Sequence, residues 1–246
     1  MNASRTFLTA EWRMAAMLNY EVDAALLEKL VPSGTELDRW QGKLFVSLVG
    51  FRFLNTKVLG MAIPFHRNFD EVNLRFYVRR RAGDEVRRGV VFIREIVPRW
   101  AIATVARVVY NENYVALPMW HRIDPREDGG VNAEYGWRTS QGRNQIHLRT
   151  SGAATLPEEG SEEQFITEHY WGYAAQRDGG CVEYRVEHPS WRVWRAASVQ
   201  FEGHTEDLYG PELAAVLKRR PASAFLAEGS EVTVRKGSRL MKDDGG

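Results

Sequence analysis

Alternation of hydrophobic and polar side chains dominates this chain, whereas stretches with helical spacing are few and short. In residues 71–79 the apolar side chains occupy one set of alternate positions, and the other set begins Glu71, Asn73, Arg75 and Tyr77. Period-two alternation of this kind is typical of β-strands. It predicts further strands over residues 12–20, 43–53, 89–97, 101–110, 131–138, 143–150, 181–188, 191–201 and 231–235.

A few helices are expected between these strands. Apolar residues recur at helical spacing in residues 21–30, Ser161 can cap a short helix, and Pro211 and Pro221 each stand where a helix can begin. Residues 43–53 are largely apolar on both faces, which is typical of a strand covered on both sides. The pattern therefore predicts a mainly β, β-rich α+β fold. We expect one domain over residues 1–240, followed by a disordered tail at 241–246.

Composition narrows the classes of protein. The 246 residues are 44% hydrophobic and 26% charged, with a formal net charge of +1, as in an ordinary globular protein. The near-zero charge argues against nucleic acid as a partner. No apolar run is long enough to span a membrane, and the start of the chain lacks the features of a signal peptide. Cys181 is the only cysteine, so a reducing, cytoplasmic setting is expected.

The sequence lacks the motifs of several kinds of catalytic and binding site. The six histidines are scattered without the short spacings that place two metal ligands on one face, so no metal site is predicted. The chain has no Gly-rich phosphate loop and no Gly-x-Ser-x-Gly elbow. Cys181 has no neighbouring cation to activate its thiol, so we interpret it as a packing residue. No cofactor is expected.

The most informative segments are residues 71–77 and 89–97. The polar face of the first segment meets either water or a polar cavity. In the second, Arg94 and Glu95 interrupt a run of apolar residues, and charges buried there must be paired or used. The alternatives are an ordinary solvent face, with an ion pair between Glu71 and Arg75, and a buried structural salt bridge.

These segments belong to a wider resemblance. The matching blocks are residues 20–38, 45–53, 69–78, 88–92, 110–119 and 187–189. Together they resemble the YqjF-like family of unknown function over roughly residues 12–235. That family is similar in fold to acetoacetate decarboxylase. The resemblance implies one large, mostly antiparallel, barrel-like sheet around a central cavity, with a few peripheral helices.

The same resemblance bears on catalysis. In acetoacetate decarboxylase, the segment that matches residues 101–120 carries a carboxylate, a proline and then two adjacent lysines, one of which forms a Schiff base. Here Glu112 and Pro118 fit, but Met119 and Trp120 stand where the lysines would be. No lysine occurs between Lys57 and Lys218. We therefore expect no decarboxylation of acetoacetate through a lysine Schiff base.

The sequence favours a cavity that binds a small organic acid or carbonyl compound. The candidate catalytic residues are Glu71 and Glu112, and the candidate ligand-binding residues are Arg75, Tyr77, Arg94, Glu95, Met119 and Trp120. Two alternatives stay open. One is a non-catalytic protein that retains the fold. The other is an interaction module, suggested by the aromatic residues at 169–173, Trp191 and Trp194. The resemblance also makes a homo-oligomer a candidate assembly.

Overall fold

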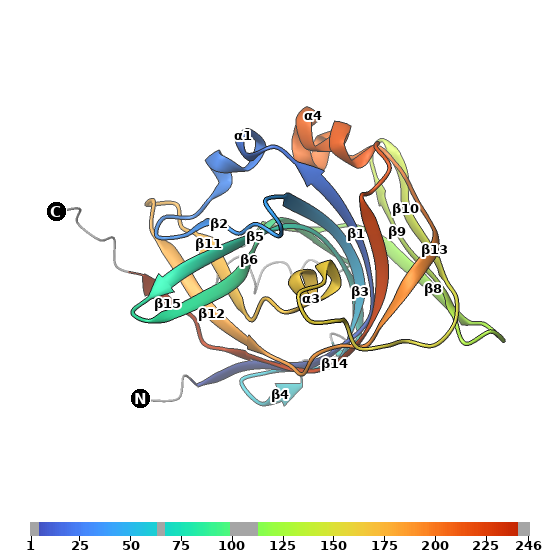
Figure 1. The fold of residues 1–246 in the computed structure, drawn as a ribbon, viewed down its shortest axis with the longest axis horizontal. Helices are drawn as coiled ribbons and strands as arrows, with labels where there is room; N and C mark the ends of the chain where they lie inside the picture. Colours follow the sequence, from blue (N-terminus) through green and yellow to red (C-terminus); the bar gives the residue numbers. More distant parts are fainter. Residues whose placement is uncertain (1–4, 63–66, 99–112, 241–246) are drawn as a thin grey trace.

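A closed ring of strands forms the centre of the molecule (Figure 1). The computed structural model describes residues 5–62, 67–98 and 113–240. Within these ranges, hydrogen bonds join neighbouring strands in the order β12-β11-β6-β5-β3-β1-β14, and β14 pairs back with β12. The pairings are antiparallel except between β11 and β6 and between β6 and β7. The ring strands are β1 (Thr6–Val22), β3 (Leu44–Val58), β5 (Phe69–Ala82), β6 (Glu85–Val97), β11 (Trp171–Ala175), β12 (Cys181–Glu187) and β14 (Ser223–Arg235).

A second sheet covers one side of the ring. It continues from β14 through β13 to β10, β9 and β8. Its strands are β8 (Met119–Pro125), β9 (Val131–Thr139), β10 (Gly142–Thr150) and β13 (Val193–Glu202). Four short strands extend the pairing, namely β2 (Glu36–Leu37), β4 (Met61–Ala62), β7 (Tyr114–Ala116) and β15 (Ser238–Leu240).

Alternation along the ring strands gives the molecule two main cores. Leu74 and Phe76 of β5 face outward into a cluster with Trp137 and Ile146 of the second sheet. Tyr77, of opposite parity, faces a separate cluster inside the ring. Both faces of β5 are therefore covered, and its polar face meets the cavity, one of the two settings that the sequence leaves open for it.

The helices differ in their relation to the ring. The helix α1 (Ala24–Leu27), its 3-10 continuation η1 (Glu28–Leu30) and α4 (Glu206–Leu217) lie outside the ring, as expected from the resemblance. By contrast, α3 (Glu162–Thr167) lies within the opening of the ring in Figure 1. Its Phe165 and Ile166 join the inner cluster, so this helix is not peripheral. The Ser161 side chain accepts a hydrogen bond from Gln164 N and caps α3 as predicted.

Three irregularities change which side chains face inward. The strand pairing shifts near Met14 in β1 and near Asn55 in β3, and both residues have a positive φ. In β6 the register shifts by one residue, because Leu74 pairs with Arg94 whereas Arg75 pairs with Phe92. Such β-bulges reverse the parity of the side chains that follow them.

The mainly β fold is confirmed, with corrections at two helices. The helical segment begins at Ala24 rather than at residue 21, because β1 extends to Val22. No helix begins at Pro221, because residues 223–235 form β14. Proline also stands readily just before a strand, and β14 alternates between Phe225, which faces inward, and Leu226, which faces outward. The strand expected over residues 101–110 lies outside the described residues.

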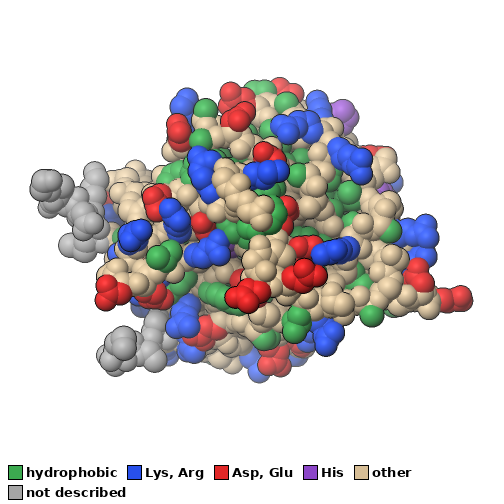
Figure 2. All heavy atoms as spheres, viewed as in Figure 1, with side chains coloured by type: hydrophobic (Ala, Val, Ile, Leu, Met, Phe, Trp, Pro, Cys, Tyr) green, Lys and Arg blue, Asp and Glu red, His purple; other side chains and the backbone are tan. Residues whose placement is uncertain are grey.

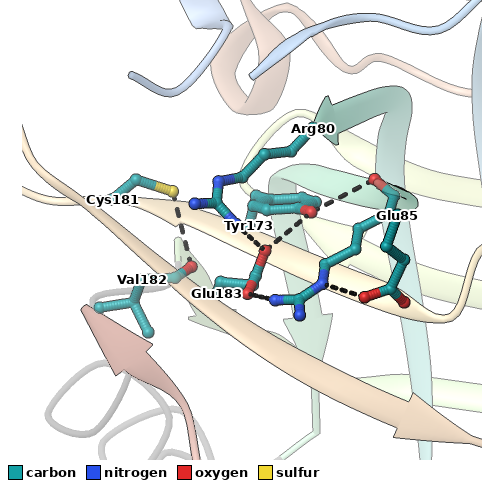
Figure 3. Close-up of polar contacts among 7 residues, drawn as sticks. Arg80, Glu85, Tyr173, Cys181, Val182 and Glu183 are labelled. Atoms are coloured by element: carbon teal, nitrogen blue, oxygen red, sulfur yellow. Dashed lines mark hydrogen bonds and ion pairs between the residues drawn. The ribbon is translucent and has the colours of Figure 1, made fainter. Parts of the chain in front are cut away.

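A buried carboxylate fastens the end of the β5–β6 hairpin to β12 (Figure 3). The Glu183 side chain accepts hydrogen bonds from Arg80 Nη1 at 3.3 Å, Arg87 Nη1 at 2.6 Å and the Tyr173 hydroxyl at 3.1 Å. The guanidinium of Arg87 also lies over the Trp171 ring, 4.3 Å from its centroid. Arg80 and Arg87 therefore join the end of the β5–β6 hairpin to β11 and β12.

Elsewhere on the surface, charges of both signs are mixed. On the face drawn in Figure 2, acidic and basic side chains alternate without a large patch of one sign. This distribution fits the nearly balanced composition. None of the helices in the described ranges has the length and apolar character required to cross a bilayer.

Candidate functional site

The ring encloses a cavity of about 200 Å³. Its walls are mostly aliphatic and aromatic. The polar side chains among its lining residues are Thr56, Glu71, Asn73, Arg75, Glu95, Tyr114, Thr167, His169, Tyr184 and His188. A concave, largely apolar space with a few convergent polar groups is the usual form of a small-molecule site.

Glu71 is the central carboxylate of this site. It lies on the inward face of β5, where its strand partner on β3 is Phe51. Asn73 Nδ2 donates to its Oε1 at 3.0 Å, and the Tyr114 hydroxyl donates to its Oε2 at 3.4 Å. Burial among apolar neighbours disfavours the charged form and raises the pKa of Glu71 to about 7. This carboxyl can therefore both give and take a proton near neutral pH.

Arg75 supplies a positive charge two positions beyond Asn73 on the same face of β5. Its Nη2 donates to the backbone oxygen of Ile166 in α3 at 3.4 Å, and its Cζ lies 5.8 Å from the centroid of the Tyr77 ring. Within the described ranges, no carboxylate lies within ion-pair distance of Arg75, and its Nε has no hydrogen-bond partner. The guanidinium thus keeps donors that can bind a ligand anion.

Arg94 and Glu95 point to opposite sides of β6. Glu95 is buried and lines the cavity. Arg94 faces the other way, where its charge acts on the Tyr209 hydroxyl of α4. Of these two candidate residues only Glu95 lines the cavity, because neighbouring side chains in a strand alternate. The bulge beside Ile93 makes Glu95, rather than Arg94, share the inward face of Phe92.

Three other candidate residues do not line the cavity. Met119 and Trp120 belong to β8 of the second sheet, where they pair with Trp137 and Gly136. These two residues do not reach the cavity because β8 lies on the outer surface of the ring. Tyr77 lies inside the ring but behind the cavity wall, with its hydroxyl 2.7 Å from Ser47 Oγ. Glu112 lies outside the described residues, and its role stays a prediction.

Sequence reasoning did not assign two histidines that line the cavity. His169 is buried, and its Nε2 lies 3.1 Å from Asp38 Oδ2, which also accepts from Arg88 Nε at 2.7 Å. Burial lowers the pKa of His169 and of His188, so both favour the neutral form. The His188 ring stacks on Trp191 at 4.3 Å. The sequence signals were indirect: His188 falls in one of the blocks that carried the family resemblance, and His169 belongs to the aromatic segment 169–173.

The lysines lie elsewhere. Five of the six fall within the described ranges, and all five are exposed, namely Lys29, Lys43, Lys57, Lys218 and Lys236. None of these five lines the cavity. The sixth, Lys242, is outside the described residues. In the part of the chain that the structure covers, no three His, Cys, Asp or Glu side chains gather closely enough to hold a metal ion.

The ring, its cavity and the covering sheet define an acetoacetate-decarboxylase-like fold. Acetoacetate decarboxylase from Legionella pneumophila has a TM-score of 0.65 to this chain, with 12% identity, over 100% of this chain and 92% of that one. The enduracididine biosynthesis enzyme MppR complexed with pyruvate has a TM-score of 0.67 at 11% identity, over 98% and 93%. An acetoacetate decarboxylase-like enzyme from Sphingomonas wittichii has a TM-score of 0.64 at 12% identity, over 96% and 93%. These likenesses show the fold alone.

The family is also shown by sequence. The chain belongs to the DUF2071 family, described as an uncharacterized conserved protein, which it matches over residues 9–231. The uncharacterized protein YqjF of Bacillus subtilis is 26% identical over 203 residues, which is 81% of this chain and 80% of YqjF. The resemblance predicted from the residue blocks is confirmed.

Proposed function

We propose that this chain binds a small organic acid or carbonyl compound in the cavity of the ring. The observation that carries the proposal is the pair of Arg75 and Glu71 on one inward face of β5. Arg75 keeps free N–H donors in an apolar cavity, where an anion is held strongly. The fold neighbour MppR, whose complex contains pyruvate, supports a ligand of this class.

In this proposal Arg75 binds the carboxylate of the ligand, and Glu71 exchanges a proton with the ligand. A general acid or base works best when its pKa lies near the working pH, and the pKa of Glu71 is raised to about 7. Glu95 adds a second carboxylate to the same cavity. Glu112 is proposed as a further acid or base on the strength of its sequence position alone.

The proposed chemistry does not use a lysine Schiff base. All five described lysines are exposed, and Lys43 forms an ion pair with Glu21 at 3.0 Å. A Schiff-base lysine needs a desolvated setting or a neighbouring cation that lowers its pKa. Borohydride treatment in the presence of pyruvate or acetoacetate should therefore leave the mass of the chain unchanged. A covalent adduct on Lys43 or Lys57 would contradict this part of the proposal.

Substitution of Arg75 tests the binding site directly. We expect Arg75→Gln to weaken pyruvate binding at least about tenfold, because a hydrogen bond to a charged group contributes about 1.5–3 kcal/mol. The measurement is isothermal titration calorimetry on the full chain. The matched control is Arg81→Gln, since Arg81 lies on the same strand but is exposed.

The control should bind pyruvate as the unmodified chain does. If the Arg75→Gln and Arg81→Gln variants bind pyruvate with equal affinity, Arg75 does not contact the ligand. If neither pyruvate nor acetoacetate binds, and native mass spectrometry of the purified chain detects no retained small molecule, the cavity charges are structural. The fold would then be retained without a ligand, which is the non-catalytic alternative.

A further inference from the structure

Beyond its charged groups, the wall of the cavity is aromatic. Trp12 meets Phe51 and Phe53 edge-on, with ring centroids 5.6 Å apart in each case, and Trp191 lies 6.4 Å from Trp12. Phe53 stacks on Phe69 at 4.6 Å with an interplanar angle of 12°. We call these five side chains the aromatic wall. All of them line the cavity.

The aromatic wall is continuous with the polar residues of β5. Phe69 and Glu71 lie two positions apart, so both point inward from the same strand. Across the pairing with β3, Phe53 is opposite Phe69 and Phe51 is opposite Glu71. A ligand whose polar head contacts Glu71 therefore has its next atoms beside aromatic rings. Two kinds of surface meet within one cavity.

The size of the cavity limits what can occupy it. An apolar protein cavity of about 150 Å³ is large enough to bind benzene. The cavity here has a volume of about 200 Å³, which leaves room for one ring or branched chain together with a short acid head. A head group alone, such as pyruvate, would leave the aromatic wall in contact with water, which costs free energy in proportion to the apolar area.

We infer that the ligand is an amphipathic acid, with one carboxylate or keto-acid head and one apolar body of about the size of a benzene ring. This inference rests on the function proposed above and specifies the class of ligand. The head contacts Arg75 and Glu71, and the body packs against the aromatic wall. Burial of a body of this size adds about tenfold to 100-fold to the affinity of the head alone.

Three probes on the full chain separate the two contributions. Pyruvate carries the head alone, benzyl alcohol carries the ring alone, and phenylpyruvate carries both. We expect calorimetry to show phenylpyruvate binding at least about tenfold more tightly than either of the others. Phe69→Leu should weaken phenylpyruvate binding and leave pyruvate binding unchanged.

A matched control locates the effect. Phe201→Leu makes the same substitution at a partly buried residue of β13, where Phe201 packs on Trp137 outside the ring. It should leave both affinities unchanged. If Phe69→Leu does not fold, Ala15→Val provides a second variant, because it adds two methyl groups to the cavity wall on β1. It should weaken phenylpyruvate binding more than pyruvate binding.

The outcomes distinguish this inference from the proposed function. Equal affinities for pyruvate and phenylpyruvate would overturn the amphipathic ligand and leave the acid site intact. Binding of benzyl alcohol as tight as that of phenylpyruvate would overturn the role of the head. If a folded Phe69→Leu variant binds phenylpyruvate as tightly as the unmodified chain does, the apolar body of the ligand does not pack against the aromatic wall. Absence of binding by all three probes would count against both proposals.

Discussion

At the scale of single residues, Glu71 couples the cavity to pH. Its pKa is raised from 4.5 to about 7 by burial, so between these values the folded chain holds a proton that the unfolded chain has released. Its contribution to the free energy of unfolding is therefore complete below about pH 4.5 and falls as the pH rises to about 7. The Glu71→Gln variant has no carboxyl at this position and should not show this loss. The free energy of unfolding of the variant minus that of the unmodified chain should therefore be about 3 kcal/mol larger at about pH 8 than at about pH 4.5.

Urea unfolding at both pH values measures the difference. Glu28→Gln is a suitable control, because Glu28 is exposed and stays in water in both the folded and unfolded states. The control should track the unmodified chain at both pH values. A Glu71→Gln variant that also tracks it would show that the carboxyl is ionised in the folded chain.

The facing of individual residues was predictable only where alternation runs unbroken. Glu71 and Arg75 share the inward face of β5, as their spacing indicates, because parity along a strand is local information. Arg94 did not follow, because the bulge beside Ile93 reverses parity and nothing local in the sequence marks it. His169 could not be assigned either, since only closure of the ring brings it to the cavity.

At the scale of elements, Glu183 holds the β5–β6 hairpin against β12. Its side chain is 3% exposed and accepts from Arg80 and Arg87. Removing one partner of a buried ion pair leaves uncompensated charge and costs about 3–5 kcal/mol. We expect Glu183→Ala to lower the free energy of unfolding by about 3 kcal/mol in urea titrations, and to increase hydrogen exchange in β11 and β12.

A half-exposed ion pair on the same strand is the control. Glu187 Oε2 lies 2.7 Å from Arg235 Nη2, but its side chain is 33% exposed. Solvent screens such a pair, so Glu187→Ala should cost no more than about 1 kcal/mol. Similar costs for the two variants would mean that the Glu183 cluster does not hold the ring closed.

Elements with strong alternation were predictable, and short or ambiguous ones were not. The pattern identified most of β3, β5 and β6, because a half-buried or covered strand needs apolar residues at regular positions. It placed a helix after Pro221, because the short apolar run there has no period that separates a strand from a helix. Pairing with β1 and β13 decides in favour of a strand.

At the scale of the whole molecule, closure of the ring cannot be predicted from the hydrophobic pattern of individual segments. The parallel pairing of β6 with β11 and the contact of β12 with β14 join residues far apart in sequence. The family resemblance supplied the central cavity instead, and the structure bears out that fold. The cavity therefore follows from topology, whereas its polar lining follows from alternation along β5.

Shared strands predict that the two sheets unfold together. β14 pairs with β1 and β12 in the ring and with β13 of the second sheet, and the outer core joins Leu74 of the ring to Trp137 of β9. We expect Trp137→Ala to lower the denaturant midpoint equally when unfolding is followed by far-ultraviolet circular dichroism and by hydrogen exchange in β5.

Truncation of a large buried aromatic side chain costs about 3–5 kcal/mol, which is enough to measure in both signals. Coincident transitions would support a single cooperative domain over residues 1–240. A shift confined to the second sheet, with β5 still protected from exchange, would instead divide the chain into two folding units. In that case the cavity should survive, since Glu71, Asn73 and Arg75 lie on β5 of the ring, and the aromatic wall belongs to the ring and to the loop before β13.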